Sequence, residues 1–158
     1  MSNDLIKIVS IRDRLSSYIG YVEIRVDRAS VLGNPFELTN EADRDKVCEA
    51  YDEWLGANIV NVKNSNLKHE PIDLTYWIDK GFKIAAKYKS PSCYQVCQEL
   101  NKHLALLRAG KKIVYKCWCK RPDREVRCHV DSIKRRMLDK YYKTSSTKPI
   151  SLASDTVK

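Results

Sequence analysis

Three cysteines and one histidine lie within thirteen positions near the end of the chain, in the stretch CWCKRPDREVRCH. Side chains alternate along a strand, so Cys117 and Cys119 would share one face of a predicted strand. Cys128 and His129 follow a polar loop and begin the last predicted helix. Zinc is held by tetrahedral sets of cysteine and histidine, and the spacing here is C-x-C followed by an adjacent C-H pair. The predicted metal site, with zinc as the candidate cofactor, consists of Cys117, Cys119, Cys128 and His129.

The same residues have two other interpretations. A cysteine at the beginning of a helix, with arginines and a histidine close in sequence, is favoured as a thiolate. Cys128 would then be a nucleophile or redox centre, and His129 would move a proton. In the third interpretation Cys117 packs within the sheet, Cys119 ends the strand and His129 lies on a helix surface. Metal binding, catalysis by Cys128 and His129, and simple packing all remain open at this level.

A second polar motif, RVDRASVLGNPF, follows a strand in which hydrophobic and charged residues alternate. A turn built on glycine, asparagine and proline, with arginines before it and a helix after it, can bind an anion through backbone N–H groups. The arginines would hold phosphate and the asparagine would orient the ligand. The predicted ligand-binding residues are Arg25, Arg28, Gly33 and Asn34. A turn of this kind also builds any ordinary connection between a strand and a helix.

The formal net charge is +9, and most of it lies near the end of the chain. Between Lys116 and Lys143 there are ten Lys and Arg residues against four Asp and Glu residues, a local charge of +6. Such clustering attracts nucleotides, nucleic acid or an acidic protein, although a solvated helix face would look the same. The predicted nucleic-acid patch consists of Lys120, Arg121, Arg124, Lys134, Arg135 and Arg136.

Length and composition indicate one ordinary globular domain. The chain has 158 residues, of which 43% are hydrophobic and 31% are charged. It contains no run of the roughly 18 apolar residues that a membrane span requires, and its first residues lack the features of a signal peptide. We therefore expect a cytoplasmic protein with no membrane partner, whose six cysteines stay thiols unless they bind metal or react.

Hydrophobic periodicity predicts strands and helices that alternate in the second half of the chain. This order favours an α/β fold, a single small domain of three layers in which a short, mostly parallel sheet is flanked by helices. The predicted strands cover residues 5–11, 21–26 and 111–119. The predicted helices cover residues 41–55, ended by Gly56, residues 91–109, capped by Ser90 and ended by Gly110, and residues 130–142. In the second helix Cys93 and Cys97 lie on the apolar stripe, so we interpret both as packing residues.

The predicted domain spans residues 1–142, and residues 143–158 form a flexible tail. Residues 57–89 are read as an insertion, with a helix interrupted near Gly81. If the protein is a structural partner in a larger assembly, this insertion would be its interface, with Tyr76 and Trp77 as anchors.

Three segments in order, IGYVEIRVDRASVLGNPFEL, RDKVCEAYDEWL and GKKIVYKCWC with CHVDSI, resemble a small family of uncharacterised domains common in bacteriophages and bacteria. The matching residues are Gly33, Asn34, Pro35, Phe36, Tyr51, Trp54, Leu55, Cys117, Trp118, Cys119, Cys128 and His129. The link between Cys119 and Cys128 is longer here than in the usual pattern, and residues 57–89 enlarge the domain. The resemblance implies an architecture, a site location and a phage or mobile-element setting, but no reaction.

Two hypotheses of function follow. In the first, the GNPF turn and the CWC…CH segment face one pocket that receives a phosphate-bearing ligand, either a nucleotide or nucleic acid, at the ends of the strands. In the second, the protein is a non-enzymatic basic module that contacts nucleic acid or an acidic host protein, and the Cys/His cluster is structural.

Overall fold

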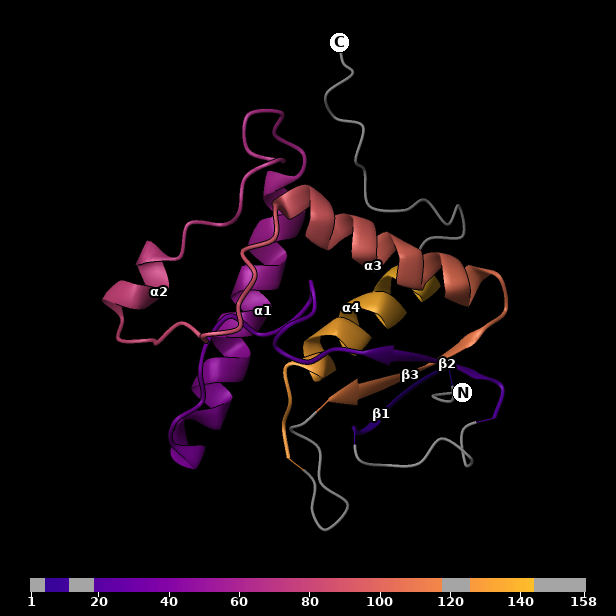
Figure 1. Cartoon of the computed structure of the whole chain (residues 1–158). Coiled ribbons are helices and arrows are strands. Elements are labelled where there is room, and N and C mark those ends of the chain that lie inside the picture. Colours follow the sequence, from indigo (N-terminus) through magenta and orange to yellow (C-terminus); the bar gives the residue numbers. More distant parts are fainter. Residues whose placement is uncertain (1–4, 12–18, 118–125, 144–158) are drawn as a thin grey trace.

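The computed structural model describes residues 5–11, 19–117 and 126–143. Its centre is a sheet of three parallel strands, β1 (Ile6–Ser10), β2 (Tyr21–Arg25) and β3 (Lys112–Cys117). The strand order is β1-β3-β2, so the last strand in sequence lies in the middle (Figure 1). The predicted α/β class with a short parallel sheet is confirmed.

The central strand β3 is buried on both faces, as central parallel strands usually are. Ile113 and Tyr115 are fully buried among the side chains of the hydrophobic core. On the opposite face Val114 is also fully buried, and Lys116 lies 3.5 Å from the carboxylate of Glu23. The strand with the most apolar run thus takes the position where both neighbours are strands.

The helices are α1 (Arg44–Asn61), α2 (Thr75–Asp79), α3 (Cys93–Arg108) and α4 (Val130–Lys143), with a short 3₁₀ helix, η3 (Glu41–Asp43), before α1. Helices α3 and α4 contact the strands and each other from one side of the sheet, and α1 packs against α3 (Figure 1). Of the three predicted layers, the described residues supply the sheet and this one helical layer. None of the helices in the described ranges is long and apolar enough to cross a bilayer.

Helix α3 confirms the predicted buried stripe but begins later than predicted. Ser92, not Ser90, is the cap: its hydroxyl accepts a hydrogen bond from the Gln95 N–H, and the Gln95 side chain accepts one from the Ser92 N–H. This reciprocal pair satisfies two backbone N–H groups at the start of the helix, which a cap at Ser90 could not do. Burial raises the pKa of Cys93 to about 11 and that of Cys97 to about 12, which agrees with their interpretation as packing residues.

Helix α1 corrects the prediction that Gly56 ends it, because the helix continues to Asn61. A glycine inside a helix costs only about 1 kcal/mol, which tertiary contacts can offset. Here the missing side chain makes room for Arg136 of α4: a Cβ at Gly56 would lie 3.1 Å from the Arg136 Nη2. Residues 57–61, predicted as the start of the insertion, therefore belong to α1.

The rest of the predicted insertion packs into the domain. Trp77, named as a candidate interface anchor, is buried. Its ring centroid lies 5.4 Å from that of Phe36, and its indole N–H donates a hydrogen bond to Glu53. The Trp77 ring packs against Phe36 of the GNPF turn, whereas Tyr76 beside it is exposed. The backbone N–H of Ala85 donates to the Pro35 carbonyl, which ties the insertion to the turn.

Candidate functional site

His129 ties the beginning of α4 to the end of β2. Its Nε2 donates a hydrogen bond to the backbone carbonyl of Val26 at 3.0 Å, and the residue is 4% exposed. A carbonyl oxygen can only accept, so this bond places a proton on Nε2 and leaves Nδ1 as the acceptor of the neutral ring. The ring of Tyr51, from α1, packs against it edge-on.

The other ring nitrogen of His129 lies beside the sulfur of Cys128. Its Nδ1 lies 3.7 Å from the Cys128 Sγ, which in turn lies 3.0 Å from the Cys117 Sγ. Both cysteines are buried, and the backbone N–H of Cys128 donates to the Asp131 carboxylate. The structure therefore gathers three of the four residues of the predicted metal set, while Cys119 lies outside the described residues.

The distances within this cluster differ from those of a zinc site. Two thiolates bound to one tetrahedral zinc lie about 3.7 Å apart, given Zn–S bonds of about 2.3 Å. The Cys117 and Cys128 sulfurs are closer, at 3.0 Å. Within the described ranges no group of three His, Cys, Asp or Glu side chains is arranged to hold a metal ion. The zinc site that includes Cys119 stays a prediction.

The GNPF turn is held by its own side chains. The Asn34 Oδ1 accepts a hydrogen bond from the Phe36 N–H at 2.9 Å, and Asn34 is 4% exposed. A Cβ at Gly33 would lie 2.4 Å from the carbonyl oxygen of Asp27, so only glycine fits there. Gly33 and Asn34, predicted to bind a ligand, are thus placed to shape the turn.

The two predicted phosphate-binding arginines lie in different surroundings. The Arg28 Nη1 donates hydrogen bonds to the carbonyl oxygens of Asn34 at 3.0 Å and Phe36 at 2.6 Å. Its guanidinium therefore stabilises the turn through neutral backbone carbonyls, and these bonds do not neutralise its positive charge. Arg25 is exposed and pairs with the Asp27 carboxylate at 3.1 Å.

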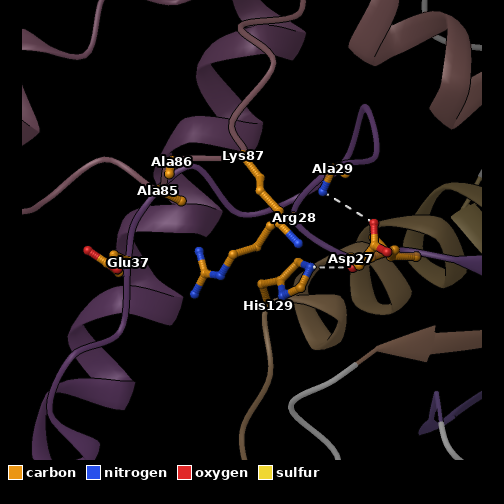
Figure 2. A pocket seen from close by; sticks show the side chains of 9 residues that line it. Asp27, Arg28, Ala29, Glu37, Ala85, Ala86, Lys87 and His129 are labelled. Carbon is orange, nitrogen blue, oxygen red and sulfur yellow. Dashed lines mark hydrogen bonds between the residues drawn. The ribbon is translucent and has the colours of Figure 1, made fainter.

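A cavity of 310 Å³ lies where these parts meet. Arg28 and His129, predicted from separate motifs, both line it, as do Asp27, Glu37 and Lys87 (Figure 2). Arg25, Gly33, Asn34 and Cys128 are not among its lining residues. No motif in the sequence indicated that Lys87 would line the cavity. Lys87 lies there because backbone hydrogen bonds join the insertion to the turn.

Comparison with known proteins gives the family. A family profile described as a domain of unknown function (DUF4326) matches residues 12–139. The chain belongs to the DUF4326 family. The GNPF turn, Tyr51 and the cluster of Cys117, Cys128 and His129 all lie within the matched range. No curated protein and no solved structure matches the chain.

In this DUF4326 domain, the described arginines of the predicted nucleic-acid patch join α4 to α1. Arg135 and Arg136 contact the same carboxylate oxygen of Asp52, at 2.6 Å and 3.1 Å, and Arg136 also donates to the Asp52 carbonyl. Lys134 is half-buried on the same helix. The remaining residues of the patch, Lys120, Arg121 and Arg124, lie outside the described residues.

The DUF4326 domain also contains a buried polar network that the sequence did not reveal. The His103 Nδ1 lies 2.9 Å from the Tyr115 hydroxyl, and its Nε2 lies 3.0 Å from the Glu99 carboxylate. The hydrogen bond with His103 lowers the pKa of Glu99, and burial raises that of Tyr115. The i, i+4 spacing of Glu99 and His103 was the available signal, but only the fold brings Tyr115 to them.

Proposed function

We propose that this domain binds a small phosphate-bearing ligand, of the size of a single nucleotide, in the cavity lined by Arg28, Lys87 and His129. The observation that carries the proposal is the convergence of two separate sequence motifs on one cavity. Arg28 comes from the segment before the GNPF turn, and His129 comes from the C-H pair at the beginning of α4. The insertion adds Lys87, so three distant segments contribute to one site.

The charge of Arg28 supports an anionic ligand. Both hydrogen-bond acceptors of its Nη1 are backbone carbonyls, which are neutral. Among the described residues Arg28 forms no salt bridge, and the Asp27 carboxylate in the same cavity is already paired with Arg25. Charge-assisted hydrogen bonds from a guanidinium are among the strongest that proteins offer to phosphate. No carboxylate in the described part of the chain neutralises the positive charge of Arg28, so it can attract an anionic ligand, and Lys87 supplies a second cation.

His129 has a different task in this site. Its Nε2 donates to the Val26 carbonyl, and its Nδ1 faces the Cys128 sulfur. Both nitrogens are occupied, so the ring serves as a wall of the cavity and fixes the position of Val26. Arg28 and Lys87 hold the phosphate, and no reaction is assigned to the site.

The position and size of the cavity agree with such a ligand. Val26 directly follows the carboxyl end of β2, and ligands of parallel α/β sheets bind beyond the carboxyl ends of the strands. The volume of 310 Å³ lies at the small end of ligand cavities, which suits a mononucleotide or sugar phosphate. Nucleic acid is the less favoured partner, because Arg135 and Arg136 are both paired with Asp52.

The test is calorimetric titration of the whole chain with nucleoside mono-, di- and triphosphates and ribose 5-phosphate, beside the unphosphorylated nucleosides. Lys87→Ala is the test variant and Lys89→Ala the matched control, since Lys89 is also exposed but does not line the cavity. We expect a phosphate compound to bind and Lys87→Ala to weaken it by about tenfold, the value of one charge-assisted hydrogen bond. Equal affinities for the two variants, or no binding of any phosphate compound, would refute the proposal.

A further inference from the structure

Two buried cysteines from different elements bring their sulfur atoms into contact. Cys117 is the last residue of β3, and Cys128 lies two residues before α4. Their Sγ atoms are 3.0 Å apart, and the residues are 0% and 1% exposed. We propose that Cys117 and Cys128 form a reversible intramolecular disulfide, which makes the pair a redox-sensitive modification site beside the ligand cavity.

Backbone hydrogen bonds fix the two residues that carry these sulfurs. The Cys117 carbonyl accepts a hydrogen bond from the Ile11 N–H at 2.9 Å, within the sheet. The Cys128 N–H donates to the Asp131 carboxylate at 2.9 Å, at the beginning of α4. A disulfide bond is about 2.05 Å long, so closing it requires a movement of about 1 Å. Rotation of the two side chains together with a small shift of Cys128 supplies that movement.

The neighbouring histidine gives the reaction a proton acceptor. With hydrogen peroxide as the oxidant, the Cys128 thiol passes its proton to the His129 Nδ1, 3.7 Å away, and the sulfur attacks one peroxide oxygen. The O–O bond breaks, and the departing hydroxide takes that proton and leaves as water. The Cys117 sulfur then attacks the sulfenic sulfur of Cys128, the S–S bond forms, and the hydroxyl group leaves with the Cys117 proton as a second water. Two thiols lose two electrons, and the peroxide gains them.

The burial of Cys117 and Cys128 limits which oxidants reach them, and another buried pair of cysteines serves as a comparison. Both sulfurs are covered by protein, so a small oxidant such as peroxide reaches them more readily than a bulky disulfide such as oxidised glutathione. Cys93 and Cys97 are equally buried and lie one turn apart on α3. The Cys97 Sγ lies 3.7 Å from the carbonyl oxygen of Asn58, which cannot take up its proton as a histidine nitrogen can. Because burial also raises the pKa of both thiols, we expect them to stay reduced under the same treatment.

The experiment uses the full chain, fully reduced and freed of reductant. It is exposed to hydrogen peroxide, denatured in an alkylating reagent, digested and mapped by mass spectrometry. We expect a peptide pair joined through Cys117 and Cys128 that dithiothreitol separates. Oxidised glutathione at the same concentration should form it at least tenfold more slowly. Cys117→Ser and Cys128→Ser should each abolish the link, and Cys97→Ser and Cys119→Ser should keep it.

Three outcomes would overturn the inference. The first is a link through Cys119, the second is both thiols still alkylated after peroxide, and the third is zinc bound in stoichiometric amount and lost in Cys128→Ser. Mapping of the unmodified sequence identifies the linked residues directly, so the result does not depend on the folding of a variant. The inference is independent of the proposed function, because disulfide formation is measured without any ligand.

Discussion

The ring of Tyr51 stands edge-on to the ring of His129, with 4.9 Å between the ring centroids. The Tyr51 hydroxyl donates a hydrogen bond to the Leu32 carbonyl at 2.7 Å, directly before the GNPF turn. One side chain of α1 therefore fixes both the turn and the histidine, the two parts from which the cavity is built. Burial raises the pKa of Tyr51, so this hydroxyl keeps its proton and remains a donor.

Replacement of Tyr51 by phenylalanine should separate these two tasks. Tyr51→Phe keeps the ring against His129 but leaves the buried Leu32 carbonyl without its donor, and we expect a loss of about 1–3 kcal/mol in the free energy of unfolding. Tyr51→Ala also removes the ring and should cost about 3–5 kcal/mol. Urea unfolding of both variants checks this order. Equal losses would mean that the ring contact contributes nothing.

Two glycines offer a matched pair for testing close packing. A Cβ at Gly33 would meet the Asp27 backbone at 2.4 Å, whereas one at Gly56 would meet the flexible end of Arg136 at 3.1 Å. The backbone can move away from a new methyl group less easily than the end of a flexible side chain can. Gly33→Ala should therefore destabilise the fold by about 2–3 kcal/mol. Gly56→Ala should change stability by less than about 1 kcal/mol, because the gain in helix propensity offsets the displaced arginine. Thermal unfolding distinguishes the two, and similar changes would contradict the assignment of Gly33 to the turn.

Removal of Arg136 should reveal the helix propensity hidden at Gly56. An Arg136→Ala background removes the three atoms nearest to the new methyl group, so Gly56→Ala should become stabilising by up to about 1 kcal/mol. Both single variants and the double variant complete the cycle. Additive effects would show that Gly56 and Arg136 do not interact.

The Glu99–His103 pair predicts a loss of stability in acid. The hydrogen bond from His103 lowers the pKa of Glu99 from its usual 4.5. A lowered pKa means that the folded state favours the carboxylate, so its contribution is complete above pH 4.5 and is lost as the pH falls through the lower folded value. Unfolding followed by urea at several pH values should show that Glu99→Gln lacks this part of the dependence. Glu49→Gln, an exposed acid on α1, is the control and should retain it.

The sequence motifs singled out Arg28 and His129, and the structure places both residues on the wall of the same cavity. The roles of their neighbours were not accessible from sequence. Asn34 and Gly33 have the residue types of a ligand-binding turn, but the same types also stabilise the turn itself. The Asn34 side chain accepts a backbone hydrogen bond of the turn, and Gly33 allows the close approach of the Asp27 backbone. Residue type alone does not distinguish a group that is used internally from one that faces a ligand.

Local patterns determined the α/β class, the parallel sheet and the buried stripe of α3, because hydrophobic periodicity acts between residues a few positions apart. The tertiary structure alone decided which polar groups are available. His129 bonds a carbonyl 103 positions away, and Arg135 pairs with Asp52 across 83 positions. Lys87 reaches the cavity because the insertion pairs with the turn. Such partners depend on how elements pack in three dimensions, and no short-range pattern in the chain encodes that packing.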